Sequence, residues 1–421
     1  MKNFDLAEYM YHKGKSLSDR LWNKGQEFTL LDENNKPILI EEYGSYVNFH
    51  HNFVGSVEHA YSDYNENFDE YGSRRKLFFR VQSEFFKELI EENKNNPNCS
   101  YVTSVDALLE DGFIPEKFSA ILQEEFHGRV DFQAVEKVGA KMLNFFSVPT
   151  IYCAHLAYKE DDLNQEFTVS PDFLRPNEIM MNLNEYMQQY VFKDDYKYIK
   201  DQTLEEFTSC YKKILKSHYK KVKENGFEIP DKKLINEKFD QWKENLSYMM
   251  LVKKYALGDR DFLARNLGVV INTQTNDINM APAFDLELMG NQDDVVSYNF
   301  LFKFNFEKES GEVNLKKWID EFYLLYYPED REVKAFIDDI KFIQKNCPQV
   351  LTKFIKKADE LLASVDNKSC KLDEFLQEFC KDANENGDQD EQYKEDFKEY
   401  FKLVRDVCEV FANESQAEMG E

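Results

Sequence analysis

Two acidic residues and one asparagine lie in an order that suits phosphoryl transfer. Asp261 and Asn266 are separated by four residues, and Asp285 follows after two apolar runs, 267–272 and 278–284, which a polar turn joins. Two strands around such a turn would bring Asp285 back beside Asn266. Carboxylate and amide oxygens are suitable magnesium ligands, so Asn266 and Asp285 could share one ion. Asp261 could then orient an attacking hydroxyl. The alternative is an ordinary Asp/Asn-rich turn, with Asp285 as a helix N-cap.

A second group of residues suits the binding of an anion. Gly72 and Ser73 precede the basic cluster 74–76, which ends in Lys76, and Arg80 follows on the same predicted strand. Clustered cations in an acidic chain favour an anion site, whereas many such clusters are only solvated faces. A phosphate-bearing ligand is therefore one interpretation of this segment, and a solvated strand edge is the other.

The elements expected around these residues change in character along the chain. The front is β-rich with one long helix, and the back is mainly helical, which predicts an α+β fold. We expect two domains, a β-rich lobe over 1–180 and a helical lobe over 181–421. The expected front elements are strands at 28–31, 38–40, 76–81 and 151–158, and helices at 84–93, 107–125 and 132–146. The expected back helices are 203–225, 233–257, 314–326, 331–346, 348–365 and 393–413.

The bulk properties narrow the class of protein. The 421 residues carry a formal net charge of -26, which opposes direct binding of nucleic acid or of an anionic membrane. The seven cysteines include no CxxC pair, which is typical of reduced thiols and not of a disulfide framework or zinc site. No signal-peptide segment and no run of 18 apolar residues occurs. We therefore expect a cytoplasmic protein.

The chemistry-bearing segments resemble those of HipA-like serine/threonine protein kinases. The segment 258–266, Gly-Asp-Arg-Asp-Phe-Leu-Ala-Arg-Asn, is similar to the catalytic loop G-N-x-D-x-H-x-x-N of that family. The segment 282–285, Pro-Ala-Phe-Asp, resembles its P-x-Y-D metal motif. More loosely, 72–81 resembles its glycine-plus-lysine loop and strand, the segment that starts at Glu136 resembles its glutamate-bearing helix, and 169–174 lies where the two lobes would be linked.

The resemblance implies a bilobal protein-kinase-like fold and an ATP- and Mg²⁺-dependent phosphotransferase. It makes Asp261 the catalytic aspartate and Asn266 and Asp285 the metal ligands. Nucleotide contacts then fall to Gly72, Ser73 and Lys76 or Arg80, with Glu136 as the partner of the nucleotide cation. It further implies a protein substrate, a toxin–antitoxin module and a small antitoxin partner.

Three departures from the family pattern keep other functions open. Leu263 replaces the loop histidine, Asp259 replaces the usual asparagine, and no separate strand lysine is evident. These changes leave open a weak kinase or a catalytically weak pseudokinase that acts as a nucleotide-dependent protein-binding module; Leu263 and the missing lysine favour the pseudokinase, and the intact Asp261, Asn266 and Asp285 oppose it. Gly258-Asp259-Arg260 also matches the start of the G-D-R-H-x-x-N loop of phosphatidylinositol kinases, although Asn266 then lies too far along the chain. The acidity of the chain argues against that anionic membrane substrate.

Overall fold

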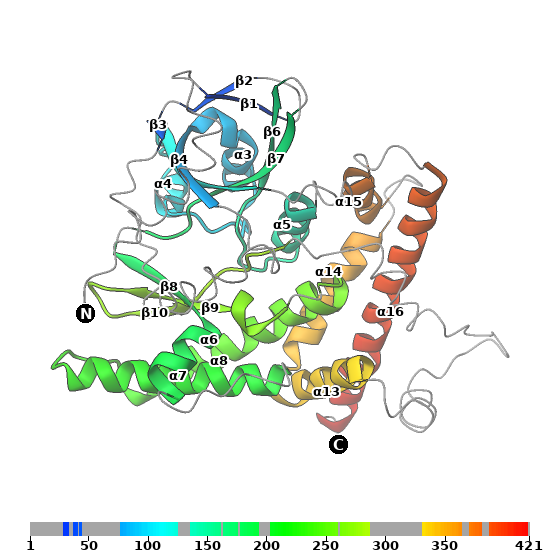
Figure 1. Ribbon diagram of the computed structural model, residues 1–421. Helices are drawn as coiled ribbons and strands as arrows, with labels where there is room; N and C mark the ends of the chain where they lie inside the picture. The colour runs from blue at the N-terminus through cyan, green and yellow to red at the C-terminus, as the bar shows by residue number, and fades with distance from the viewer. Residues whose placement is uncertain are drawn as a thin grey trace. The chain divides into compact units, whose positions relative to one another are not determined.

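A computed structural model of the chain describes residues 28–32, 37–40, 42–43, 76–124, 135–160, 163–175, 177–192, 203–259, 262–286, 331–363, 370–380 and 387–419 (Figure 1). The backbone divides into two compact units. The first unit comprises Met1–Lys197 and Arg265–Glu287, and the second comprises Tyr198–Ala264 and Leu288–Glu421. The first unit holds the strands and the second is helical, so the predicted mixture of helix and sheet is confirmed. The division into 1–180 and 181–421 stays a prediction.

A seven-stranded antiparallel sheet dominates the first unit, with the strand order β2-β1-β6-β7-β5-β4-β3. The predicted hairpin near residue 30 is confirmed, because Phe28 lies opposite Ile40 and Leu31 opposite Pro37. The strand predicted from residue 76 is also confirmed, as β4. The strands are β1 (Phe28–Asp32), β2 (Pro37–Ile40), β3 (Glu42–Tyr43), β4 (Lys76–Gln82), β5 (Lys117–Glu124), β6 (Ala154–Glu160) and β7 (Leu163–Pro171).

The helix predicted over 107–125 is wrong. A single turn, α4 (Asp106–Glu110), ends at Gly112, whose φ of 76° lies in the left-handed region that glycine tolerates best. The Phe113 N–H then donates to the Leu108 carbonyl at 2.8 Å, which closes the helix in a Schellman-type cap. Residues 117–124 form β5, which pairs with β4 on one side and β7 on the other. Tertiary pairing thus decides the structure of a segment that could serve locally as either element.

A second, three-stranded sheet in the first unit has the order β10-β9-β8. The two strands predicted around the polar turn are confirmed as β9 (Gly268–Asn272) and β10 (Ile278–Met280), while β8 (Glu178–Asn182) was not predicted. Helical segments complete the unit: η2 (Ser83–Phe86), α3 (Lys87–Asn95), α5 (Val135–Phe145), α6 (Leu183–Tyr186) and the π-helix η4 (Met187–Phe192).

One hydrophobic cluster joins the two sheets of the first unit. Phe173 and Leu174, just after β7, pack with Met180 of β8 and Ala281, just after β10. Partly buried side chains of Val102, Ile151, Val270 and Phe284 lie against this cluster. The end of the large sheet is therefore held against the hairpin that carries Asn266 and Asp285.

The second unit is an assembly of amphipathic helices. Its first helices have side-chain N-caps, because Thr203 Oγ1 accepts from the Glu206 N–H and Asp231 Oδ1 accepts from the Lys233 and Leu234 N–H groups. The sequence did not predict α15, and the helix expected over 314–326 lies outside the described residues. The helices are α7 (Leu204–Glu224), α8 (Lys232–Met249), the π-helix η5 (Met250–Ala256), α13 (Arg331–Asn346), α14 (Gln349–Leu362), α15 (Lys371–Cys380) and α16 (Gly387–Met419).

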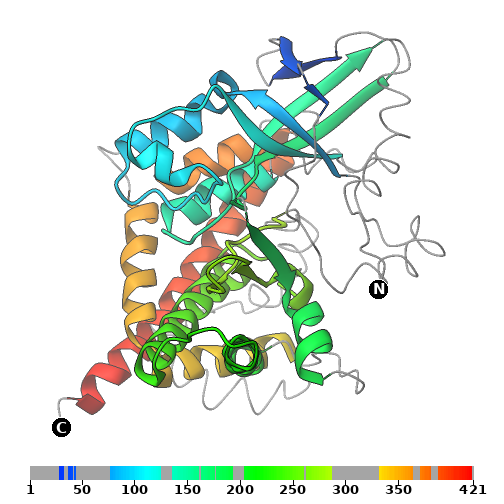
Figure 2. The ribbon, with the colours of Figure 1, turned by 90° about the vertical axis from the view of Figure 1, so that its left-hand side faces the viewer.

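The long helix α16 connects the other C-terminal helices of this unit, as Figures 1 and 2 show in red. Gln344 Nε2 of α13 donates to the Phe411 carbonyl at 2.8 Å. Arg405 Nε of α16 donates to Asp359 Oδ1 of α14 at 2.8 Å. None of the helices in the described part of the chain combines the length and the apolar character that crossing a bilayer requires.

Candidate functional site

The hairpin β9–β10 aligns Asn266 with the segment that leads to Asp285. Met280 lies opposite Val269, and the Ala281 N–H donates to the Gly268 carbonyl at 2.9 Å. Asn266 lies two residues before Gly268, in the 3-10 turn η6 (Ala264–Asn266), and Asp285 follows Ala281 by four residues. Both predicted metal ligands therefore belong to the open end of one hairpin. Asn266 is buried and Asp285 is partly exposed.

The segment before Asp285 is fixed by a short parallel contact with residues 149–151. The Ala283 N–H donates to the Pro149 carbonyl at 2.7 Å, and the Ile151 N–H donates to the Ala283 carbonyl at 3.1 Å. Thr150, which is fully buried, adds a bond from Oγ1 to the same carbonyl at 3.2 Å. These three bonds leave little freedom for the backbone two residues before Asp285.

Asp285 has a backbone conformation that few residues adopt. Its φ is 55°, in the left-handed region, where aspartate and asparagine are tolerated better than most side chains. Such conformations are found where the surrounding structure imposes them, often at functional sites. The anchored Ala283 supplies that constraint here.

The amino-terminal half of the candidate loop belongs to the second unit. Gly258 has a φ of 68°, which explains a glycine at the start of the loop. Phe262 is buried, and its ring centroid lies 6.0 Å from that of Phe207 in an edge-to-face arrangement. Leu263 is half-buried. Arg260 and Asp261 lie outside the described residues, so the role of Asp261 stays a prediction.

The predicted nucleotide contacts are described only in part. Gly72 and Ser73 lie outside the described residues. Lys76 and Arg80 lie on β4, where their backbones pair with Gln123 and Ser119 of β5. Their part in anion binding stays a prediction.

A glutamate on a helix usually lies at the protein surface, but Glu136 is buried. It lies in the first turn of α5 and is only 7% exposed. A buried carboxylate needs a compensating partner, which is the environment that a nucleotide-site glutamate requires. Its role also stays a prediction.

The donor set at the hairpin fits magnesium better than a transition metal. Magnesium is bound through one or two protein oxygen ligands, with water and substrate phosphates completing the octahedron. Asn266 and Asp285 offer an amide and a carboxylate oxygen. Among the described residues, no group of three or more His, Cys, Asp or Glu side chains could hold a metal by itself. The residues present therefore suit an ion that arrives with a phosphate ligand.

Two buried groups near the candidate segments were not singled out from the sequence. Asp172, after β7, is 7% exposed, and burial raises its pKa to about 6. Lys253, on η5, is 1% exposed. The signal for Lys253 is present in the sequence, because two lysines interrupt an otherwise apolar stretch at 248–257. Asp172 gives no comparable signal.

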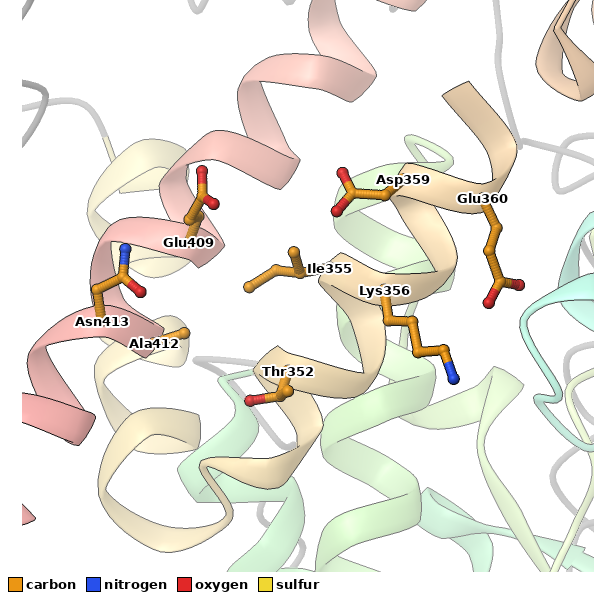
Figure 3. A pocket seen from close by; sticks show the side chains of 8 residues that line it. All are labelled: Thr352, Ile355, Lys356, Asp359, Glu360, Glu409, Ala412 and Asn413. Atoms are coloured by element: carbon orange, nitrogen blue, oxygen red, sulfur yellow. The ribbon is translucent and has the colours of Figure 1, made fainter. Parts of the chain in front are cut away.

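A groove of about 480 Å³ in the second unit contains none of the predicted site residues (Figure 3). Its acidic side chains are already compensated in part, since Arg405 bonds both Asp359 and Glu409. The groove is therefore a polar surface feature between α14 and α16, and none of the candidate chemistry is assigned to it. It is lined by Thr352, Ile355, Lys356, Asp359, Glu360, Glu409, Ala412 and Asn413.

Comparison with known proteins gives only a distant likeness. No family model matches the sequence, and no curated protein matches it. Among solved structures, the chain is similar to the crystal structure of a Helicobacter pylori proinflammatory kinase, CtkA, with a TM-score of 0.41 and 12% sequence identity. The alignment covers 70% of this chain and 89% of the Helicobacter chain. No chemistry is transferred from so distant a neighbour, and the candidate site rests on the residues described above.

Proposed function

We propose that this chain is a cytoplasmic, ATP- and Mg²⁺-dependent kinase that phosphorylates serine or threonine in a protein. The observation that carries the proposal is the register of the β9–β10 hairpin, which brings Asn266 and the Asp285 segment to the same end. The similarity of 258–266 and 282–285 to HipA-like motifs supports a role of these residues in phosphoryl transfer. The buried Glu136 and the cations on β4 support the proposal as candidates for holding the nucleotide.

In this proposal each residue has a distinct role. Asn266 and Asp285 would hold magnesium, which would supply positive charge to offset that of the nucleotide phosphates. Asp261 accepts the proton of the acceptor hydroxyl as that oxygen attacks the γ-phosphorus, and the bond to the β-phosphate oxygen breaks to release ADP. Lys76 or Arg80, oriented by Glu136, contacts the nucleotide phosphates. Gly72 and Ser73 cover them with backbone N–H groups.

The acceptor protein is expected to present basic side chains near its serine or threonine. The chain carries a formal net charge of -26, which attracts a basic partner and repels an acidic one. The resemblance to HipA-like kinases adds a small antitoxin as a second expected partner. Both expectations belong to the proposal.

The test is transfer of label from γ-labelled ATP, with magnesium, to proteins of a host lysate. Asp285→Asn removes a proposed metal ligand, and Asp277→Asn makes the same change at the turn end of the same hairpin. We expect label with the wild type and Asp277→Asn, and none with Asp285→Asn. Equal labelling by the two variants would contradict the proposal.

The pseudokinase function is the second candidate, and Leu263 in place of the family histidine favours it. It predicts magnesium-dependent ATP binding, seen as a rise in melting temperature, without transfer of label. The same two variants decide it, since only Asp285→Asn should abolish the rise. If ATP does not bind to the wild type, both candidate functions are wrong.

A further inference from the structure

A buried ion pair joins the π-helix η5 to the first residues of the candidate catalytic loop 258–266. Lys253 Nζ lies 3.1 Å from Asp259 Oδ2, and the two side chains are 1% and 0% exposed. The same two residues are joined through the backbone, because the Asp259 N–H donates to the Lys253 carbonyl at 3.1 Å. The pair therefore closes the turn between η5 and the loop at two points.

The pair accounts for a departure from the family motif. HipA-like loops have a neutral asparagine after the glycine, and this chain has Asp259. A buried carboxylate without a counter-charge is strongly unfavourable, and a buried lysine is equally so. Lys253 and Asp259 therefore depend on each other, and neither charge suits this interior alone.

Lys253 also contacts Phe262, the first described residue after 260–261. Its Nζ lies 6.0 Å from the ring centroid of Phe262, within cation–π range. Phe262 is in turn packed against Phe207 of α7. One buried ammonium group thus holds Asp259 before the two-residue segment 260–261 and Phe262 after it.

The element that presents Lys253 is itself unusual and firmly held. η5 is a π-helix of seven residues, a conformation that is rare and is frequently found at functional sites. The next two side chains face another partner: Lys254 Nζ lies 3.9 Å from Asp339, and the Tyr255 hydroxyl donates to the same carboxylate. The Tyr400 hydroxyl of α16 bonds the Tyr255 carbonyl. These contacts fix η5 from the side of the C-terminal helices.

We infer that Lys253 and Asp259 are positioning residues for the candidate loop, because they fix the chain at Asp259 and at Phe262, the described residues on either side of 260–261. This inference rests on the proposed kinase function. It predicts that neutralising only one of the two residues loosens the loop and lowers kcat. Neutralising both residues should restore the loop and most of the activity. Lys253→Met with Asp259→Asn replaces both charged groups of the pair by neutral side chains, with asparagine at the position where HipA-like loops have it.

The experiment is a double-mutant cycle with two independent measurements. The variants are Lys253→Met, Asp259→Asn and the double variant, with Arg405→Met as a control that breaks an ion pair elsewhere in the same unit. The first measurement is hydrogen exchange of peptides covering 257–264. We expect both single variants to exchange at least about tenfold faster there, the double variant to return to the wild-type rate, and the control to be unchanged.

The second measurement is phosphotransfer, resolved into kcat and KM for ATP. We expect each single variant to lose about 100-fold in kcat with little change in KM, and the double variant to recover most of this loss. A double variant as poor as the worse single variant, or a control that loses as much as Lys253→Met, would overturn the inference. If the wild type transfers no phosphate, the proposed function fails, while hydrogen exchange still decides whether the pair holds the loop.

Discussion

Gly268 lies so close to Met181 that a Cβ atom added to the glycine would stand 2.8 Å from the Met181 carbonyl oxygen. The close approach occurs where β8 pairs with the first residue of β9. One position further back, the Leu183 N–H donates to the Leu267 carbonyl at 2.8 Å. These contacts press the start of β9 against β8 and so fix the backbone that carries Asn266. Glycine is required there because the obstructing atom belongs to the backbone of a paired strand.

Gly268→Ala should therefore lower both stability and magnesium-dependent ATP binding. A side chain forced into a filled space costs about 1–3 kcal/mol of unfolding free energy. Because β9 must move away from β8, Asn266 moves with it, and the affinity for ATP with magnesium falls. Urea unfolding and a binding titration measure the two effects. Asn279→Ala, on the exposed side of β10, is the control. If both variants behave as wild type, the close contact does not position Asn266.

Asp285 should respond differently to asparagine and to alanine. Asparagine tolerates a left-handed φ as aspartate does, so Asp285→Asn should change the unfolding free energy by less than about 0.5 kcal/mol. Alanine at a φ of 55° should cost about 1–2 kcal/mol. Both variants should lose magnesium-dependent ATP binding, because both lose the carboxylate. Urea unfolding beside a magnesium titration separates the two effects, and full binding by Asp285→Ala, which leaves no ligand oxygen at this position, would exclude this residue as a metal ligand.

The hairpin was predictable from the sequence because its signals are local. Two apolar runs around a polar turn predict the two strands β9 and β10, with Asn266 before the first strand and Asp285 after the second. The first hairpin and the long helices of the second unit were predictable from their apolar patterns as well. Glu136 could be placed on a helix in this way, but its burial could not be foreseen.

The features that escaped prediction depend on contacts between distant segments. β5 became a strand only because β4 and β7 flank it, and its local pattern did not exclude a helix. The ion pair of Lys253 and Asp259 requires the π-helical turn of η5, which no periodicity indicates. The burial of Asp172 follows from packing after β7. Each of these belongs to tertiary structure and not to the local sequence.

Asp172 should make the first unit less stable as the pH rises. Desolvation by burial raises its pKa from 3.8 to about 6, while N–H groups of Leu174 and Phe173 lower it in part. The folded state therefore holds a proton that the unfolded chain releases, so this stabilising effect is complete below pH 3.8 and is lost as the pH rises to about 6. The loss amounts to about 3 kcal/mol at most.

Asp172→Asn tests this directly. The amide has no charge to desolvate, and its oxygen can still accept from the Leu174 N–H, which lies 2.9 Å from Oδ1 in the wild type. We expect the variant and the wild type to be about equally stable at pH 4, and the variant to be more stable at pH 7. Thermal melts at both values measure the difference, with Asp111→Asn as an exposed control. An unchanged difference between the two pH values would contradict the assigned cause.

Asp339 should be among the most sensitive positions of the second unit. Its Oδ1 accepts from the Leu204 N–H at 2.8 Å, and its Oδ2 accepts from the Tyr255 hydroxyl. The carboxylate is 2% exposed and thus joins α13 to the start of α7 and to η5. Asp339→Ala leaves a buried N–H and a buried hydroxyl without an acceptor, and each costs about 1–3 kcal/mol.

The neighbouring residue supplies the matched control for this change. Asp338 is exposed on the same helix, so Asp338→Ala should alter the unfolding free energy by less than about 0.5 kcal/mol. We expect Asp339→Ala to shift the urea midpoint strongly with little change in the slope, and Asp339→Asn to fall between the two. Hydrogen exchange across η5 should rise in Asp339→Ala alone, because Tyr255 loses the acceptor that fixes it. Equal midpoints for the two alanine variants would mean that Asp339 of α13 does not hold η5.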